Sequence, residues 1–479
     1  MLDNKFILSF NRDVILKTDN EKLLLLRGEY SLPIKNSSIG IRTLLALLAD
    51  NGANVDELWE KTSAVDPTIE LTHFYFFIER LSQNGFIKYI LQQDKKVLAT
   101  LEPMAPGFQF EAILNTAETH WRLSRFAYMH AVDSKFFLES PLSAVRLWLN
   151  DSHATALVTS LITPRSQNGL QNDFPQLTSD TQSALLQMLL TTCAIFAVDS
   201  DGKLPEECEL TLRQWEFHDL LFHSRNCSGR HDYLYGGTFR FLNNIEATPV
   251  TKAPMSTEII QLPIPDPKTF QHGPLFQDVL ETRRSIRTAS KKPLVLIQLS
   301  EFLYRSAHIK SLHPANKTNK KSYETSSRPY PSGGAMYELE IYLNVQRCEG
   351  LRPGLYHYNP QNHSLEYLVI DDKAVELYFQ TMVSMSGTNY NPDILITITA
   401  RFSRVSWKYQ SIAYALILKN VGVLYQTFYL VATAMKLAPC AIGGGNADAF
   451  ANLTGLDYYT ESSVGQFMLS NISDQNVSF

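Results

Sequence analysis

Pro331-Ser332-Gly333-Gly334-Ala335 is the middle one of three short segments that together indicate a site for a phosphorylated group with a flat ring. Arg283-Arg284-Ser285-Ile286-Arg287 precedes it, and Pro439-Cys440-Ala441-Ile442-Gly443-Gly444-Gly445 follows it. Clustered guanidinium groups beside a hydroxyl suit a phosphate, because they offer forked cationic donors. Glycine pairs let a backbone approach a planar ring, because no Cβ stands in the way. The three segments therefore predict a bound phosphorylated cofactor with a planar head.

A fourth segment, Ser406-Trp407-Lys408-Tyr409-Gln410-Ser411, places a lysine-tyrosine pair ahead of a long apolar stretch that ends at Met435. The order and composition of the four segments resemble the nitroreductase-like flavoproteins, and among them the SagB/ThcOx-type azoline dehydrogenases of peptide natural-product biosynthesis. Together with its two-part N-terminal region, the chain looks most similar to the cyanobactin thiazoline oxidases. The resemblance covers residues 276–479 well and the residues before them more weakly.

By this resemblance the cofactor is FMN. The phosphate and ribityl chain would be held by Arg283, Arg284, Ser285 and Arg287. Arg283 and Arg287 stand four residues apart, the spacing of one helix face, so we expect both to grip one phosphate. The two glycine segments would lie against the isoalloxazine ring, where backbone N–H groups favour hydride acceptance. The ring contacts that the resemblance implies are Pro331, Ser332, Gly333, Gly334, Ile442, Gly443 and Gly444.

Each segment also has a plainer interpretation. The arginines are compatible with a solvated charge cluster, and the glycine segments with a turn and a helix-ending loop. The family often supplies a further basic contact near its C-terminus, and Gln466 to Asn471 contains none. The FMN assignment therefore depends on the order of the segments rather than on any one of them.

Lys408 and Tyr409 are the residues that the resemblance assigns to catalysis. Making a thiazole or oxazole from an azoline removes a proton from one ring carbon and a hydride from its neighbour. The proton step needs a positioned base. A tyrosine beside an ammonium becomes acidic enough to serve, and a lysine whose pKa burial lowers could serve as well. The sequence leaves both assignments open, against the plainer alternative of a surface lysine beside a core tyrosine.

Three further residues are candidates for contact with the substrate, namely Arg404, His223 and Arg230. We expect the segment from His218 to His231 to pack over the mouth of the flavin site. It contains histidines and a cysteine, but His218 and His223 lie five residues apart and face different ways on a helix. We therefore expect no metal there.

Composition limits the classes of function. The chain has 479 residues, a net charge of −5 and a hydrophobic fraction of 44%, values typical of a folded protein of two or three domains without a basic surface for nucleic acid. Five scattered cysteines and a start without signal-peptide character favour the cytoplasm. The most apolar stretch, Val421 to Met435, is interrupted by polar residues and predicts a buried core helix rather than a membrane span.

The pattern of apolar residues predicts four regions. Residues 1–105 and 106–207 each alternate like strands and then take helical spacing, so we expect two related winged-helix-like modules that bind peptide. Residues 208–275 would form a helical connector and a Pro-rich linker, because prolines from Ala247 to Pro274 preclude a continuous helix or central strand. Residues 276–479 would form the FMN-binding domain, an α+β sandwich. A polar loop from Lys310 to Tyr323 is expected to be mobile.

The main hypothesis is an FMN-dependent enzyme that oxidises thiazoline or oxazoline rings of a ribosomally made precursor peptide. The family implies a homodimer through the FMN domain and oxygen as the final acceptor, and a cyclodehydratase is a candidate partner. Two alternatives remain: a nitro- or quinone-reducing flavoenzyme that uses NAD(P)H, and a non-catalytic redox sensor whose modules bind peptide or DNA. The absence of a P-loop, a Rossmann fingerprint and an HExxH motif excludes the common nucleotide and zinc-protease sites.

Overall fold

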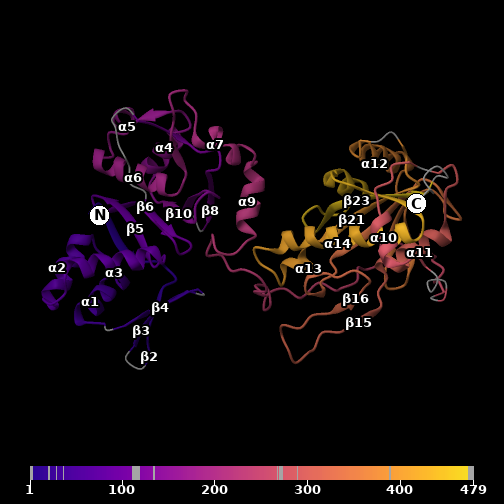
Figure 1. Cartoon of the computed structure of the whole chain (residues 1–479), viewed down its shortest axis with the longest axis horizontal. Coiled ribbons are helices and arrows are strands. Elements are labelled where there is room, and N and C mark those ends of the chain that lie inside the picture. Colours follow the sequence, from indigo (N-terminus) through magenta and orange to yellow (C-terminus); the bar gives the residue numbers. More distant parts are fainter. Residues whose placement is uncertain are drawn as a thin grey trace. The chain divides into compact units, whose positions relative to one another are not determined.

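The computed structural model describes residues 4–472 except for 20–21, 29, 36, 111–118, 133–134, 267, 269–272, 289 and 388–389. The chain forms two compact units, Met1–Tyr233 and Leu234–Phe479. Each unit is described by itself (Figure 1).

Unit 1 is built, over its described residues, around one six-stranded sheet and two smaller ones. The main sheet has the spatial order β1 (Phe6–Phe10), β5 (Ile87–Gln93), β6 (Lys96–Pro103), β10 (Val145–Leu149), β9 (Lys135–Glu139) and β8 (Tyr128–Val132). The smaller sheets have the orders β2 (Ile15–Asp19), β3 (Lys22–Arg27), β4 (Tyr30–Ile34) and β11 (Arg165–Ser166), β7 (His120–Leu123), β12 (Ile195–Ala197). The helices are α1 (Ile39–Ala49), α2 (Val55–Val65), α3 (Leu71–Gln83), α4 (Ser152–Ser160), α5 (Gln167–Asp173), α6 (Ser179–Thr191), α7 (Pro205–Cys208), α8 (Leu210–Arg213) and α9 (Phe217–Arg225).

The longer helices of unit 1 begin at residues that local sequence chemistry favours. Ser38, Asn54, Asp151 and Thr178 each accept a hydrogen bond from a backbone N–H in the first turn of the helix that follows. Such caps satisfy N–H groups that the helix itself leaves without partners. Helix boundaries in this unit are therefore fixed locally, and packing then decides how the helices are placed.

The order of elements in unit 1 occurs twice. A first strand, a three-stranded meander, three helices and a return strand run from β1 to β5, and the same series, with the two-residue strand β11 added between α4 and α5, runs from β7 to β12. The return strand pairs antiparallel with the first strand in both series. The turns before the return strands also match, because Gly85 and Cys193 both have positive φ, and the next N–H bonds five residues back in each case. This agrees with the similarity that the sequence indicates between Phe77–Tyr89 and Leu185–Ala197.

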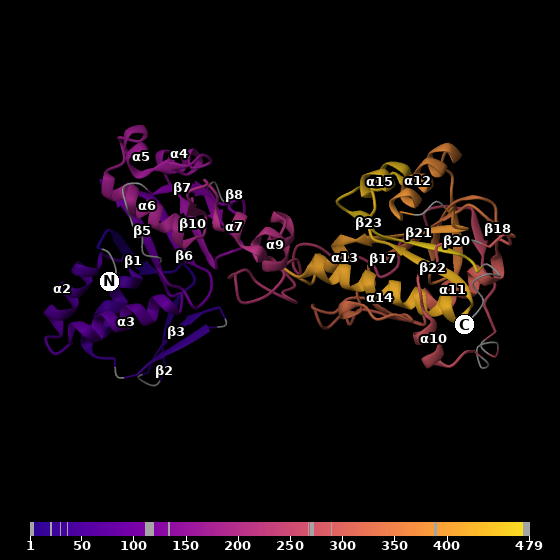
Figure 2. The ribbon, with the colours of Figure 1, turned by 45° about the horizontal axis from the view of Figure 1, so that its top comes forward.

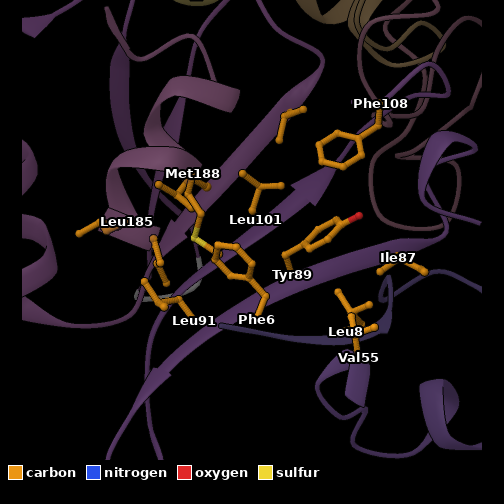
Figure 3. Close-up of a cluster of buried hydrophobic side chains, with 14 of the residues drawn as sticks. Phe6, Leu8, Val55, Ile87, Tyr89, Leu91, Leu101, Phe108, Leu185 and Met188 are labelled. Carbon is orange, nitrogen blue, oxygen red and sulfur yellow. The ribbon is translucent and has the colours of Figure 1, made fainter. Parts of the chain in front are cut away.

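Strand β6 joins the two repeats into one body. It follows β5 of the first repeat and pairs antiparallel with β10 of the second, with Leu101 opposite Leu147. A single cluster of buried apolar side chains runs through both repeats. In Figure 3, Met188 of α6 lies beside Phe6 of the first repeat and near Leu101 of β6. The repeats therefore share one core.

Unit 2 has a seven-stranded sheet, over its described residues, with helices on both faces (Figure 2). The sheet has the order β13 (Ile259–Gln261), β20 (Ser364–Leu368), β19 (Gly354–Asn359), β17 (Leu339–Val345), β21 (Ile394–Arg401), β23 (Glu461–Asn471) and β22 (Leu437–Ile442), with antiparallel neighbours. Two short pairs are β14 (Leu294–Val295) with β18 (Cys348–Glu349) and β15 (Ser311–His313) with β16 (Thr325–Ser327). The helices are α10 (Phe276–Thr282), α11 (Leu296–Ala307), α12 (Asp372–Met385), α13 (Phe402–Ser406), α14 (Ala413–Ala434) and α15 (Ala447–Thr454), with the single turn η2 (Gly333–Ala335).

Alternating side chains of the sheet build two cores. Ile394, Ile396 and Ile398 of β21 pack with α11 and α14 on one face. Leu395 between them packs with α12 and α15 on the other face. The α+β sandwich expected for residues 276–479 is therefore present. Helix α14 is long and apolar enough to cross a membrane by composition, but its Val421 lies in the first of these cores, so it packs as a core helix.

The Pro-dense stretch from Ala247 to Pro274 is not a free linker over its described part, which corrects the expectation from sequence. Val250 is fully buried in the core of unit 2, and Arg401 donates hydrogen bonds to the carbonyls of Pro249 and Val250. β13 adds to the outer edge of the sheet, where prolines are tolerated. The prolines therefore exclude a helix, as expected, but the segment is fastened along the second unit.

Replacing Leu101 by alanine tests whether the two repeats share a core. Leu101 has no exposed surface, so we expect a loss of about 2–5 kcal/mol in the free energy of unfolding. Because β6 touches both repeats, Trp59 of the first and Trp148 of the second should report one coincident transition in denaturant. Leu71→Ala on α3 is the control, since Leu71 is 47% exposed. Separate transitions for the two tryptophans would contradict a shared core.

Candidate active site

Lys408 and Tyr409 meet the first glycine segment in space. Both lie in the short connection between α13 and α14. Gly334 has φ 64°, and a Cβ added there would overlap the Tyr409 hydroxyl and lie 3.0 Å from Lys408 Nζ. The structure therefore brings the two predicted catalytic residues to the backbone that is predicted to face the flavin ring. Their roles remain predictions.

A third side chain, which the sequence did not single out, completes this cluster. Tyr323 accepts a hydrogen bond from Lys408 Nζ at 2.7 Å and donates one to the carbonyl oxygen of Gly334 at 2.8 Å. Tyr323 ends the polar loop that we expected to be mobile, and β15 within that loop pairs with β16. The loop is therefore held at both of these points, and its last residue belongs to the site.

Asn420 of α14 holds the glycine turn from the other side. Its Oδ1 accepts from the N–H of Gly333 at 3.1 Å, and its Nδ2 donates to Ser332 and to Glu338 Oε1, the latter at 2.8 Å. Ser332 in turn donates to Glu338. Burial raises the pKa of Glu338, against the opposing effect of the Asn420 hydrogen bond. This buried network fixes the conformation of Ser332 and Gly333.

Lys408 is held as an ammonium. Burial opposes its charge, but the hydrogen bond from Nζ to Tyr323 and attraction to Tyr323 and Tyr409 outweigh burial and raise the pKa of Lys408. A lysine that keeps its proton near neutral pH cannot accept another, so the geometry favours Tyr409 over Lys408 as a base.

The arginine-rich segment lies beside the last strand of the sheet. Ser285 and Tyr429 of α14 share a hydrogen bond of 2.7 Å, and the Arg283 guanidinium lies 5.2 Å from the centre of the Tyr429 ring. The N–H of Ile286 bonds to the carbonyl of Pro439, the first residue of the third segment quoted above. Within the described residues, Arg283 and Arg287 form no ion pair with a carboxylate. These cations are therefore not neutralised by the protein, as a phosphate site requires.

One expectation about these arginines is wrong. Helix α10 ends at Thr282, and Arg283 is its C-cap with ψ 123°, so Arg283 and Arg287 do not share a helix face. The N–H of Ile286 pairs instead with the neighbouring strand, which draws the segment out of helical conformation. Arg284 is exposed, so it too is accessible.

The second glycine segment has open space beside it. A Cβ on Gly443 or Gly444 would meet no atom within 4 Å in the described structure. Ile442 is 3% exposed, and its side chain belongs to the core under α15, so only its backbone can face a ligand. The segment thus offers bare backbone where a flat ring is expected to lie.

Helix α14 connects the two ends of the predicted FMN site. Asn420 supports the glycine turn and Tyr429 supports Ser285, and nine residues of helix separate them, about 13 Å along the axis. A group with a ring at one end and a phosphate at the other matches this arrangement. The residues present therefore fit FMN, with Arg283, Ser285 and Arg287 at the phosphate and Gly333 and Gly334 at the ring.

Arg404 is buried, which disfavours its predicted contact with a substrate, and that contact stays a prediction. It is 2% exposed, and its guanidinium donates to the carbonyls of Met336, Thr248 and Glu324. Burial lowers the pKa of Arg404 to about 10. Its donors are used to fasten three separated segments, which is a structural role.

His223 and Arg230 belong to unit 1, whereas the segments of the Lys408 cluster belong to unit 2. His223 stacks on Trp215, and Arg230 donates to the carbonyl of Pro141 at 3.0 Å. Within unit 2, Lys408 is instead covered by residues 236–245, where Phe239 N–H bonds to the carbonyl of Lys408. Contact of His223 or Arg230 with substrate remains a prediction. In the described residues no three His, Cys, Asp or Glu side chains gather in a way that could hold a metal.

Replacing Gly334 by alanine tests the close approach at the turn. Its positive φ and its contacts with Tyr409 and Lys408 both oppose a side chain, so we expect a larger loss of stability than φ alone causes, which is about 1 kcal/mol. Gly387→Ala is the matched control, because Gly387 has φ 68° but nothing within 4 Å. Denaturant unfolding of both variants measures the difference, and equal losses would contradict the crowded geometry.

Comparison with known proteins gives three family matches that follow one another along the chain. The ThcOx helix turn helix domain matches residues 2–112, the cyanobactin oxidase ThcOx matches 121–232, and the nitroreductase family matches 280–469. The third range contains every residue of the glycine turn, the Lys408–Tyr409 pair and the arginine-rich segment.

Two curated relatives match the C-terminal part. "Putative nitroreductase MJ1384" of Methanocaldococcus jannaschii is 29% identical over 186 residues, 39% of this chain and 85% of that protein. The microcin B17-processing protein McbC of Escherichia coli is 30% identical over 137 residues, 28% of this chain and half of McbC.

Two solved structures resemble this chain at low sequence identity. The E. coli microcin synthetase McbBCD complex with truncated pro-MccB17 bound has 19% identity and a TM-score of 0.34, covering 57% of this chain and 100% of that one. The nitroreductase with bound FMN from Bacteroides fragilis has 13% identity and a TM-score of 0.26, covering 43% and 92%. The three consecutive matches show a ThcOx helix turn helix domain, a cyanobactin oxidase ThcOx region and a nitroreductase domain, and with a site that fits FMN the chain is an FMN-dependent oxidoreductase similar to the ThcOx-type cyanobactin oxidases.

Proposed function

We propose that the protein oxidises thiazoline or oxazoline rings in a ribosomally made precursor peptide of the cyanobactin type to thiazoles or oxazoles. The observation that carries this proposal is the position of the Lys408 ammonium and the Tyr409 hydroxyl against the turn at Gly334. An acid-base pair beside the predicted ring site is what removal of a proton and a hydride from adjacent carbons requires.

Tyr409 is the base in this proposal. The ammonium of Lys408 lies 4.9 Å from the centre of the Tyr409 ring, so the two predicted catalytic side chains stand together at the glycine turn. The phenolate takes the proton from the ring carbon that is flanked by C=N and a carbonyl, and a new C=C bond forms as hydride leaves the neighbouring carbon. Bound FMN supplies the hydride acceptor, and dioxygen is the oxidant that restores it.

Replacing Tyr409 by phenylalanine removes the base and keeps the ring. With FMN-loaded protein and an azoline-bearing peptide, the wild-type product should be two hydrogens lighter per ring by mass spectrometry. We expect Tyr409→Phe to retain flavin absorption and to lose at least about 100-fold in rate. Tyr367→Phe on β20 is the control.

The same assay separates the alternatives. Bleaching of the flavin by NADPH without oxygen, together with an unchanged peptide, would identify a nitro- or quinone-reducing enzyme. Salt-dependent binding of DNA by unit 1 would favour the redox sensor. Full activity of Tyr409→Phe would remove the base assignment but not the oxidation.

The peptide partner is proposed to bind in a groove of unit 1. A cavity of about 400 Å³ lies between β4 and α3, and it is lined by Pro33, Ile34, Lys35, Ile41, His73, Phe76, Phe77 and Arg80. Within the described residues, β4 pairs with β3 only, so its outer edge is open. An open strand edge beside an apolar groove accepts an extended peptide as an added strand.

The second repeat supports this mode of binding. Its corresponding strand, β10, has the same edge occupied by β6, which pairs antiparallel with it. Strand β5 of the same hairpin contacts α6, the counterpart of α3. The space that is open in the first repeat is thus filled in the second by strands of the chain itself. We therefore propose an antiparallel peptide strand on β4, with acidic side chains toward Lys35 and Arg80.

Charge reversal at Arg80 tests the groove. We expect Arg80→Glu and Phe76→Ala each to weaken binding of a labelled precursor peptide about tenfold in fluorescence anisotropy, through loss of one charge-assisted contact and one apolar contact. Phe76 is 64% exposed, so its truncation should leave the fold intact. Leu71→Ala on the same helix is the control. Equal affinities in all three variants would place peptide binding elsewhere.

We also propose a homodimer contact, a cyclodehydratase partner and a cytoplasmic location. Exposed Leu275 and Phe276 at the start of α10 form an apolar surface on unit 2 that suits a homodimer contact. A cyclodehydratase is a chemical necessity upstream, because the azoline ring must be made before it is oxidised. The scattered cysteines favour action in the cytoplasm.

A further inference from the structure

Lys408 is surrounded by three aromatic rings. Its Nζ lies 5.6 Å from the ring centre of Phe239, 5.0 Å from that of Tyr323 and 4.9 Å from that of Tyr409. A cation is attracted to the faces of aromatic rings at such distances. Among the described residues, none that carries a carboxylate forms an ion pair with Lys408. The rings and the phenol oxygens of Tyr323 and Tyr409 are thus its stabilising partners.

The three rings come from three separate parts of unit 2. Tyr409 follows Lys408, Tyr323 ends the polar loop, and Phe239 lies in the strap of residues 236–245. An antiparallel bridge between Gly236 and Gln410 and the bond from Phe239 N–H to the Lys408 carbonyl hold the strap in place.

Trp407 supports two of these rings. It contacts Phe239 at 5.6 Å and Tyr323 at 5.9 Å between ring centres, in edge-on orientations. Its indole N–H donates to the carbonyl of Ile245 at the end of the strap. The ring arrangement is therefore braced by packing and does not depend on the Lys408 hydrogen bond.

The Tyr323 hydroxyl accepts one defined hydrogen bond and donates another. Lys408 has only donors, so the Tyr323 oxygen must accept from it. The single hydrogen of that hydroxyl is then used on the carbonyl of Gly334. Tyr323 thereby links the ammonium to the backbone of the glycine turn, across 85 residues of sequence.

We infer that Tyr323 is a positioning residue for the oxidation: through its hydroxyl it fixes Lys408 between Gly334 and Tyr409 and keeps the ammonium beside the base. This inference deepens the proposed function and rests on it. The hydroxyl need not touch the substrate, because it acts through Lys408.

The charged groups near Lys408 determine whether loss of the Tyr323 oxygen makes Lys408 more or less acidic. Among the described residues, the charged side chains near these rings include Arg404, 5.7 Å from the centre of the Tyr323 ring, Lys321, 5.5 Å from that of Phe239, and Glu324, which attracts Arg404. Arg404 and Lys321 are cationic and disfavour a further ammonium. Removing the Tyr323 oxygen therefore leaves Lys408 with repulsion and fewer attractions, so its proton should be lost at lower pH.

The first experiment follows the Lys408 proton without any turnover. Protein carrying ¹³Cε-lysine is titrated by NMR, with the Lys408 signal assigned by its loss in Lys408→Arg. Tyr323→Phe keeps the ring and removes the oxygen, and we expect Lys408 to become about tenfold more acidic, the effect of one hydrogen bond to a charged group. Tyr367→Phe should leave the titration unchanged. An unaltered Lys408 titration in Tyr323→Phe would overturn the inference.

The second experiment uses the FMN-loaded enzyme and an azoline peptide. We expect Tyr323→Phe to lower kcat about tenfold with KM and flavin content unchanged. The alkaline limb of the pH–rate profile should move to lower pH, and deuterium at the abstracted position should slow the variant more than the wild type. A fall in flavin content, or a raised KM alone, would indicate a structural or binding role and would contradict positioning.

The two experiments separate the possible failures. A wild-type enzyme that does not oxidise the peptide would end the proposed function, while the NMR titration would still report whether Tyr323 holds the Lys408 proton. An active wild type whose Tyr323→Phe variant has normal kcat and normal pH dependence would end the inference alone.

Discussion

The left-handed turn at Gly334 is the constraint on which the site depends. Tyr323 bonds to its carbonyl, Asn420 holds the preceding N–H, and the Tyr409 and Lys408 side chains occupy the space that a Cβ would need. A glycine here is therefore required twice, by its φ and by crowding. Because each neighbour comes from a different part of unit 2, the turn is also the point at which these parts are held in register.

Arginines in unit 2 divide into two groups by what surrounds them. Arg401 and Arg404 are buried and donate to backbone carbonyls of the segment before the sheet, which they fasten to the unit. Arg283 and Arg287 are more accessible and, among described residues, lack a carboxylate partner. A cation whose donors already bind the protein serves the fold, whereas one left without an anion is ready for a ligand. This difference separates the cofactor candidates from Arg404.

The repeats of unit 1 show how one arrangement of elements acquires two uses. In the second repeat the edge of the meander is closed by β6, which merges the cores of both repeats. In the first repeat the equivalent edge remains open beside an apolar groove with basic side chains. Closing one edge joins the two repeats, and the other edge, open among the described residues, is the surface that we propose for the peptide.

The sequence by itself indicated the class of fold and the repeated plan of unit 1, because these depend on periodicity, on caps and on the order of short segments. Through its resemblance to a known family it also predicted the FMN-binding segments and the chemical pair Lys408 and Tyr409. It did not identify Tyr323 or Phe239, and it treated Asn420 only as an interruption of an apolar stretch. It also placed Arg283 and Arg287 on one helix face, although α10 ends at Thr282, and it did not show that the Pro-dense segment is fastened to unit 2.

Only the tertiary structure decided those points, because they depend on contacts between residues that are far apart in the sequence. A local pattern reports on neighbours within a few residues, whereas Tyr323 reaches Lys408 across 85 positions and Arg404 reaches Thr248 across 156. Whether a guanidinium binds a ligand or a carbonyl, and whether a loop is free or held, depends on which distant backbone folds against it.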